Sequence, residues 1–234
     1  MTNIENIKIG GALPVGEIKK FLEASYDQKP PAKIGDFQLD TELSNLTVKV
    51  YFSINKKKVV IVYRGTKEIS DWGNNLVYAL NSNLYNLTSR YRTAKSVQQK
   101  TEKKYKGYMI ESLSHSQGSI IAHKLGEKSH DIISLNPAYK GESQRNNEYI
   151  IRSSLDPVSV LKAPKNAINS YLNPQWNKKH NITIKAKTSN PLKEHSIDIL
   201  NRLPQNQQIG RNDKSLGGYV KYQIKSDFPF NSEM

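Results

Sequence analysis

The sequence contains no cysteine, and this absence excludes disulfides, thiolate metal sites and cysteine nucleophiles together. It also lacks any apolar run of about 20 residues, the length that a membrane-spanning helix needs. Its first residues do not combine positive charge with an apolar stretch, so we expect no signal peptide. Together these absences favour a protein that acts in the cytoplasm.

Negative charge is also scarce, because 21 Asp and Glu residues face 35 Lys and Arg residues and leave a formal net charge of +14. Such a balance attracts anionic membranes or nucleic acid, and it also aids solubility. The basic residues form small clusters, such as Lys56-Lys57-Lys58 and Lys103-Lys104, whereas a nucleic-acid module concentrates them. We therefore expect peripheral contact with an anionic membrane. Nucleic acid stays open but is not favoured, and the oligomeric state is undetermined.

Hydrophobic periodicity predicts alternating strands and helices, with no repeat and no clear domain boundary. We expect helices over 15–26, 69–80, 90–105 and 119–125, and strands over 46–53, 59–63, 109–113, 132–135, 149–152 and 182–186, with 219–224 as a further edge strand. The first two strands flank a turn at Asn55-Lys56-Lys57 and should form a hairpin, the first of them half-buried. This order indicates an α/β sheet that is mixed at its leading edge and parallel in its middle.

Ser116 lies in Ser114-His115-Ser116-Gln117-Gly118, between an expected strand and an expected helix. A serine on such a turn, with small residues two positions before and after it, is typical of a nucleophile elbow. The turn projects the hydroxyl alone, and the small neighbours let strand and helix approach closely. We therefore predict Ser116 as a nucleophile, although Ser114 stands where glycine is usual.

A serine nucleophile needs a histidine base that is oriented by a carboxylate, and in sheets of this type the chain order is serine, acid, histidine. Asp156 follows the strand at 149–152 and His195 follows the strand at 182–186, so both fit. Six other residues are less well placed: Asp131, His130 and His180 precede strands, Asp198 follows His195, His123 is helical, and His115 must point away from Ser116.

The loop after the strand at 59–63 is expected to complete the site. An oxyanion hole needs hydrogen-bond donors aimed at the developing negative charge. The backbone N–H of Gln117 is one, and Thr66 offers both its N–H and its hydroxyl. We interpret Arg64 and Trp72 as structural. The stretch 83–87 is a candidate substrate-covering lid, with an ordinary surface connection as an equal alternative.

These segments resemble the class 3, fungal-type lipases. The resemblance rests on Tyr63-Arg64-Gly65-Thr66, Asp71-Trp72, Asn75-Leu76, His115-Ser116-Gln117-Gly118, Leu135-Asn136-Pro137, Asp156-Pro157-Val158-Ser159-Val160-Leu161 and His195, in consistent order from Leu46 to Leu200. In its elbow, the chain is closest in style to lipase-like proteins encoded by large DNA viruses, which adds a virion-associated location to the expectation. Ser114, Ser119 and Asn75 depart from the family pattern, and none of them removes a catalytic group.

The resemblance implies one α/β-hydrolase domain over 1–234, a three-layer sandwich with a mixed, mostly parallel sheet and helices on both faces. The lipase-like core would cover 46–200, with a helix and lead-in over 1–45 and an extension over 201–234. It also implies a triad of Ser116, His195 and Asp156, with Thr66 and Gln117 as the oxyanion hole and with no metal or cofactor.

By the same resemblance, the substrate is a lipid or a small carboxylic ester that is cleaved through an acyl-enzyme. Lipase, esterase and phospholipase A-type activities all remain open, and protease or thioesterase chemistry shares the same machinery. The alternative from another class is a non-catalytic lipid-binding, nucleic-acid-binding or virion-associated protein on a hydrolase scaffold, because a fold does not determine a function.

Overall fold

The computed structural model describes residues 12–66, 88–138, 145–157 and 180–211. Its main sheet contains β2 (Lys33–Ile34), β3 (Phe37–Leu39), β4 (Val48–Ser53), β5 (Lys58–Tyr63), β6 (Met109–His115), β7 (Asp131–Leu135), β8 (Glu148–Ser153) and β9 (Asn181–Ile184). The helices are α1 (Val15–Tyr26), α4 (Ser89–Lys104), α5 (Gly118–Leu125) and α9 (Pro191–His195), with short 3₁₀ turns η2 (Gly126–Lys128) and η3 (Ile197–Arg202). A separate antiparallel pair joins β1 (Leu13–Pro14) to β10 (Gln208–Ile209).

Within the described ranges, the eight strands of the main sheet follow one another in chain order from β2 to β9. Pairing is antiparallel from β2 to β5 and parallel from β5 to β9. This confirms the predicted change from a mixed leading edge to a parallel middle, and it confirms the hairpin of β4 and β5. Because parallel strands end at the same edge, the residues that follow β6 and β8 come close together.

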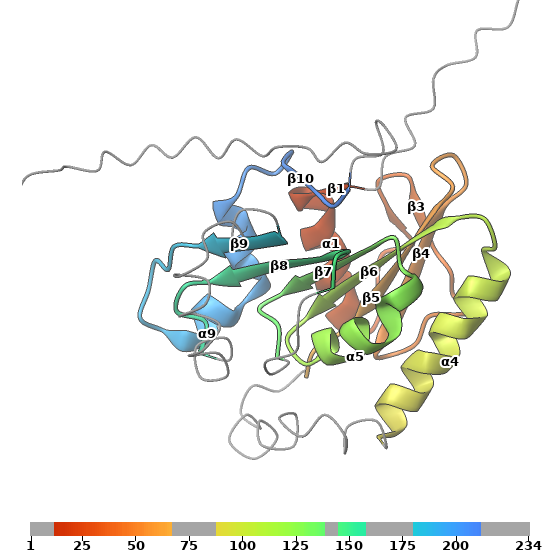
Figure 1. Cartoon of the computed structure of the whole chain (residues 1–234), viewed down its shortest axis with the longest axis horizontal. Coiled ribbons are helices and arrows are strands. Elements are labelled where there is room, and N and C mark those ends of the chain that lie inside the picture. Colours follow the sequence, from red (N-terminus) through yellow and green to blue (C-terminus); the bar gives the residue numbers. More distant parts are fainter. Residues whose placement is uncertain (1–11, 67–87, 139–144, 158–179, 212–234) are drawn as a thin grey trace, which may run out of the picture.

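Two apolar clusters occupy the two faces of the sheet, and the alternation of side chains along β5 shows why. Val60 and Val62 pack toward α1, whereas Val59, Ile61 and Tyr63 pack toward α4 and α5. A strand that is buried on both faces has a nearly continuous apolar sequence, and β5 has such a sequence from Val59 to Tyr63. With helices on both faces (Figure 1), the protein is a three-layer α/β sandwich of the α/β-hydrolase type.

The expectation that the first strand is half-buried was wrong. Lys49 and Tyr51 lie on the face that the alternation assigned to solvent, yet both are buried. Tyr51 packs edge-on against Phe21 of α1, with ring centroids 5.2 Å apart. Lys49 reaches the backbone oxygen of Asn45 with its ammonium group at 2.5 Å. Helix α1 therefore covers the side of β4 that was expected to face solvent. The local sequence pattern of β4 gives no sign of this covering helix.

Most expected elements are confirmed with small shifts at their ends. The short strands β2 and β3 lie in the segment that was expected to be only a lead-in after α1, and their brevity explains why periodicity does not reveal them. The helix expected at 69–80, the strand at 219–224 and the candidate lid at 83–87 fall outside the described residues.

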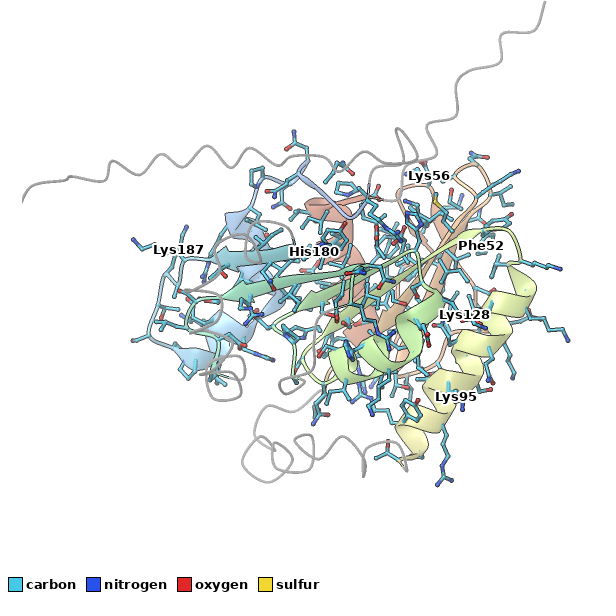
Figure 2. The ribbon with its side chains drawn as sticks, viewed as in Figure 1. Phe52, Lys56, Lys95, Lys128, His180 and Lys187 are labelled. Atoms are coloured by element: carbon cyan, nitrogen blue, oxygen red, sulfur yellow. The ribbon has the colours of Figure 1, made fainter. Side chains whose placement is uncertain are left out.

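Lysine side chains project from several parts of the molecule, and Figure 2 shows Lys56, Lys95, Lys128 and Lys187 well separated from one another. They come from the β4–β5 turn, from α4, from η2 and from the segment after β9. The described surface therefore carries its charge in a dispersed form, in line with the small clusters in the sequence. Among the helices that the structure describes, none has the length and hydrophobicity of a membrane span.

Candidate active site

Ser116 lies on the turn between β6 and α5, with a backbone φ of +54°. This left-handed conformation is unfavourable for a residue with a side chain, and it persists only where neighbours enforce it. The Ser116 N–H donates to the oxygen of Leu135 at 3.1 Å, and its own oxygen accepts from the N–H of Ser119 at 3.0 Å and from that of Ala138 at 3.3 Å. The serine is therefore held in the strained geometry of a nucleophile elbow.

Two glycines make this turn possible because they let backbone segments touch. A Cβ at Gly118 would lie 2.1 Å from the oxygen of Tyr63, so α5 starts directly against the end of β5. A Cβ at Gly65 would lie 2.9 Å from the Cβ of Ser116. The loop that follows β5 therefore passes immediately beside the serine, as the expected oxyanion loop requires.

Ser114 and Ser119, the two serines beside the turn that depart from the expected pattern, both make hydrogen bonds. The Ser114 hydroxyl is buried and lies 2.9 Å from the hydroxyl of Ser134, its register partner on β7. The Ser119 hydroxyl donates to the oxygen of Ser116 at 2.6 Å and accepts from the N–H of Ala138 at 2.9 Å. The Ser119 side chain, from the first turn of α5, therefore helps to hold the Ser116 turn in place.

His195 and Asp156 are brought together from distant parts of the chain. His195 ends α9, Asp156 follows β8, and their Nδ1 and Oδ1 atoms lie 2.5 Å apart. Both side chains are buried, with side-chain exposures of 2% and 0%. A carboxylate oxygen only accepts, so Nδ1 carries the proton and Nε2 is left as the basic nitrogen of the ring.

The loop that carries His195 is fixed at the residue before it. Glu194 is buried and accepts from Arg202 with both carboxylate oxygens, at 2.7 and 3.0 Å. It also bonds the Ser153 hydroxyl and the N–H groups of Lys187 and Thr188. The Arg202 guanidinium, aided by these donors against the effect of burial, lowers the pKa of Glu194 to about 2.

Asn136 ties the same loop to the sheet. It follows β7 with a φ of +43°, a conformation that asparagine tolerates better than most residues. Its side-chain amide donates to the oxygen of Glu194 at 3.1 Å, and its side-chain oxygen accepts from the N–H of Ser153 at 3.0 Å. Neither Glu194 nor Asn136 was predicted as a site residue, and only the Leu135-Asn136-Pro137 segment of the resemblance drew attention to Asn136.

One pocket of about 590 Å³ brings the predicted residues together. Its lining includes Thr66, Ser116 and His195, and it also includes Tyr26, His115, Leu192, Lys193, Ile197 and three carboxylates, Glu23, Asp27 and Asp198. Asp156 lies behind His195 and is fully buried. The structure thus places the predicted nucleophile and base, with Thr66, on one concave surface.

Thr66 and Gln117, the two expected oxyanion residues, contact each other. The Thr66 hydroxyl donates to the side-chain oxygen of Gln117 at 2.5 Å. Gln117 is the N-cap residue of α5, so its N–H is one of the backbone donors at the start of that helix. Arg64 stacks its guanidinium over the ring of Tyr26, 5.9 Å from the ring centroid, as a structural residue would.

The alternative acids and bases lie elsewhere or make other contacts. Asp131 accepts from Arg211 at the amino end of β7, away from Ser116. His123 bonds Glu148, and His180 packs on Tyr149. Asp198 lines the pocket but its side chain is 72% exposed. His115 lines the pocket with its ring 5.0 Å from that of His195, and its contacts are those of a supporting residue.

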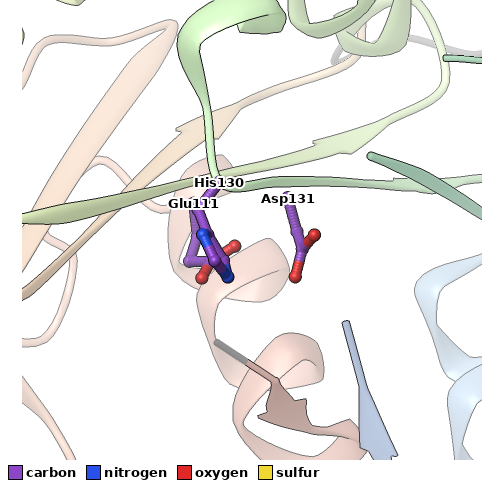
Figure 3. A group of neighbouring side chains, drawn as sticks. All are labelled: Glu111, His130 and Asp131. Atoms are coloured by element: carbon purple, nitrogen blue, oxygen red, sulfur yellow. The ribbon is translucent and has the colours of Figure 1, made fainter. Parts of the chain in front are cut away.

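A second polar cluster lies toward the amino ends of β6 and β7, at the opposite strand ends from the candidate active site. Glu111, His130 and Asp131 lie side by side there (Figure 3). Their candidate ligand atoms lie within 4.8 Å of one another. Arg211 bonds both carboxylate oxygens of Asp131 at 2.6 and 2.8 Å, and the ammonium of Lys58 lies 3.9 Å from Glu111. The protein's own cations therefore balance these carboxylates, and we assign the cluster a structural role.

Comparison with known proteins gives similarity at the level of structure. No protein-family model matches the chain, and no curated protein matches it in sequence. The structure is similar to that of a Rhizomucor miehei lipase in a propeptide complex, with 14% identity and a TM-score of 0.43 over 66% of this chain. The alignment spans 63% of that lipase chain, which is less than two thirds of its length.

Two further solved structures are similar in the same way. A triacylglycerol lipase from Penicillium expansum has 18% identity, a TM-score of 0.42, and coverage of 74% of this chain and 78% of its own. A lipase from Yarrowia lipolytica has 11% identity and a TM-score of 0.42, with coverage of 64% and 74%. At these identities and TM-scores, the similarity carries no conclusion about the activity of this chain.

Proposed function

We propose that this protein is a serine hydrolase that cleaves carboxylic esters of lipids. The observation that carries the proposal is the 2.5 Å contact between His195 and Asp156, made beside the pocket that Ser116 also lines. A strained serine, a buried histidine and a buried carboxylate in the order serine, acid, histidine form the combination that acyl transfer needs. The proposed groups come from three segments: the turn after β6, the loop after β8 and the end of α9.

In the proposed mechanism, Ser116 attacks the ester carbonyl while His195 takes the hydroxyl proton at Nε2. Asp156 holds the ring in the tautomer that leaves Nε2 available and stabilises the imidazolium that forms. His195 then donates the proton to the leaving alcohol, and an acyl-enzyme remains on Ser116. Water, activated by His195, releases the acid and restores the serine.

The proposed oxyanion hole combines the N–H of Gln117 with a donor from Thr66. The N–H lies at the start of α5, where unsatisfied backbone donors favour negative charge. The contact between the Thr66 hydroxyl and the Gln117 side chain keeps the two residues adjacent. When charge develops on the carbonyl oxygen, the Thr66 hydroxyl can turn from Gln117 toward it, which would make this donor specific to the transition state.

The pocket lining supports a lipid ester as substrate. Its volume of about 590 Å³ falls in the range of small-molecule sites. Leu192 lines it and is 48% exposed, so an apolar side chain stands at the pocket and also faces solvent. The net charge of +14 attracts the protein as a whole to an anionic lipid surface, whereas Glu23, Asp27 and Asp198 make the pocket itself locally acidic.

Labelling with a fluorophosphonate probe tests the proposed chemistry. We expect the wild type to be labelled, and we expect Ser116→Ala, which removes the reacting oxygen, to remain unlabelled. Asp156→Asn and His195→Ala should stay folded and lose most labelling. An unlabelled wild type would leave the non-catalytic binding protein as the better reading, and labelling of Ser116→Ala would place the nucleophile elsewhere.

Substrate class needs a separate experiment. Hydrolysis of p-nitrophenyl esters of short and long acyl chains separates an esterase from a lipase. Flotation with phosphatidylglycerol or phosphatidylcholine vesicles tests the membrane contact, which we expect to favour the anionic vesicles and to weaken as salt is added. Binding that depends on neither lipid charge nor salt would contradict the electrostatic part of the proposal.

A further inference from the structure

Tyr26, the last residue of α1, makes polar contacts on two sides of the candidate active site. Its hydroxyl accepts from the N–H of Gly65 at 3.0 Å and lies 2.6 Å from Nδ1 of His115. The other ring nitrogen of His115, Nε2, lies 2.8 Å from the backbone oxygen of His195. A continuous hydrogen-bonded path thus runs from the loop before Thr66 to the backbone of His195.

The direction of each bond in this path follows from its ends. A backbone oxygen only accepts, so Nε2 of His115 carries the proton. Burial, followed by the nearby His195, lowers the pKa of His115 to about 3, so its ring is neutral and Nδ1 accepts. The Tyr26 hydroxyl therefore donates to Nδ1 and uses an oxygen lone pair for Gly65. Every donor in the path has one acceptor, and no alternative arrangement satisfies all of them.

The hydrogen-bonded path runs directly beside the candidate nucleophile Ser116. His115 is the residue before Ser116, and Gly65 is so close that a Cβ there would lie 2.9 Å from the Cβ of Ser116. The rings of His115 and His195 also lie close together, tilted by 42° with centroids 5.0 Å apart. The Tyr26 hydroxyl is thus connected to the loop after β5 directly and to the loop that carries His195 through His115.

We propose that Tyr26 is a positioning residue that, through His115, sets the distance between the oxyanion loop and His195. This inference rests on the proposed hydrolase function, because it concerns the alignment of that site. Misplacement of catalytic groups by about 1 Å lowers rates by about 100-fold. Loss of the hydroxyl should therefore slow acylation more than it weakens substrate binding.

Tyr26→Phe tests the inference because it removes only the oxygen. We expect kcat and the rate of fluorophosphonate labelling to fall by roughly 10- to 100-fold while KM changes less than about twofold. Tyr51→Phe is the matched control, since Tyr51 is a buried tyrosine beside α1 whose hydroxyl bonds the oxygen of Pro31 at 3.0 Å. It should lower the melting temperature about as much as Tyr26→Phe and leave kcat unchanged.

His115 offers a rescue experiment. Gln at this position can accept from Tyr26 and donate to His195, so His115→Gln should retain most of kcat, whereas His115→Leu should resemble Tyr26→Phe. The double variant Tyr26→Phe, His115→Leu should be no slower than either single variant, because both break the same path. Additive losses, or wild-type kcat in Tyr26→Phe, would overturn the inference. An unlabelled wild type would instead refute the hydrolase proposal.

Discussion

Arg202 holds both carboxylate oxygens of Glu194, at 2.7 and 3.0 Å, one residue before His195. A planar guanidinium and a carboxylate match in geometry, and such a paired contact resists rotation. The Asn136 amide fixes the backbone of the same residue from the neighbouring strand end. The histidine loop is therefore anchored through its side chain and its main chain at one position.

We predict that Glu194→Gln lowers the free energy of unfolding by about 2–4 kcal/mol, because it removes the negative charge and one of the two acceptors that face the guanidinium of Arg202 in a largely buried position. Urea unfolding measures this loss. Arg202→Lys is the matched variant, since it keeps the charge and removes the paired geometry, and it should lose less. Equal stability of Glu194→Gln and wild type would contradict the anchoring role.

The same carboxylate predicts a pH dependence. Its pKa is lowered to about 2, chiefly by Arg202, from the ordinary value of 4.5. A carboxyl whose pKa is lower in the folded state stabilises the fold above pH 4.5, and this contribution is lost as the pH falls from about 4.5 to about 2. Urea unfolding followed across that window should show a smaller decline for Glu194→Gln than for wild type, and parallel curves would refute the assignment.

Gly118→Ala should prevent stable folding of the elbow. The added Cβ would meet the backbone oxygen of Tyr63 at 2.1 Å, and neither β5 nor α5 can retreat without breaking the core, so we expect a loss above about 4 kcal/mol. Gly16→Ala is the control, because its nearest contact is an ordinary 3.4 Å and alanine favours helix α1. It should be neutral or slightly stabilising in thermal unfolding.

Ser114 and Ser134 are predicted to act as a pair. Ser134→Ala leaves the buried hydroxyl of Ser114 without this partner and should cost about 1–3 kcal/mol. The double variant Ser114→Ala, Ser134→Ala removes both hydroxyls. It should lower the free energy of unfolding by less than the sum of the two single losses. A double-mutant cycle by urea unfolding measures the coupling, and a coupling energy of zero would show that the short contact contributes nothing.

Thr66→Val tests the hydroxyl of the proposed oxyanion hole at nearly constant volume. Loss of one oxyanion donor lowers kcat by about 100- to 1000-fold, so we expect a fall of that order with little change in KM. Thr66→Ser keeps the hydroxyl and should remain within about tenfold of wild type. If Thr66→Val retains full kcat, the Thr66 donor is its backbone N–H and the hydroxyl serves only to hold Gln117.

Local sequence patterns were sufficient to predict most of the longer elements and to single out Ser116 as the candidate nucleophile. The apolar run of β5 and the helical spacing of α1 are local patterns. They predict the elements correctly because each element buries its own apolar face in the folded protein. The elbow is also local, since Ser116, Gly118 and the strand and helix beside them lie within one short segment. The placement of Asp156 and His195 after successive strands followed from chain order alone.

Which polar groups contact one another depends on how the elements pack, and local sequence patterns do not contain that information. Tyr26 carries no local sign of its role, because its partners Gly65 and His115 are 39 and 89 positions away and become neighbours only when α1 packs on the sheet. Burial of Lys49 on β4 has the same origin. Periodicity reports the face that an element buries, whereas hydrogen bonds between distant loops depend on how those elements are stacked.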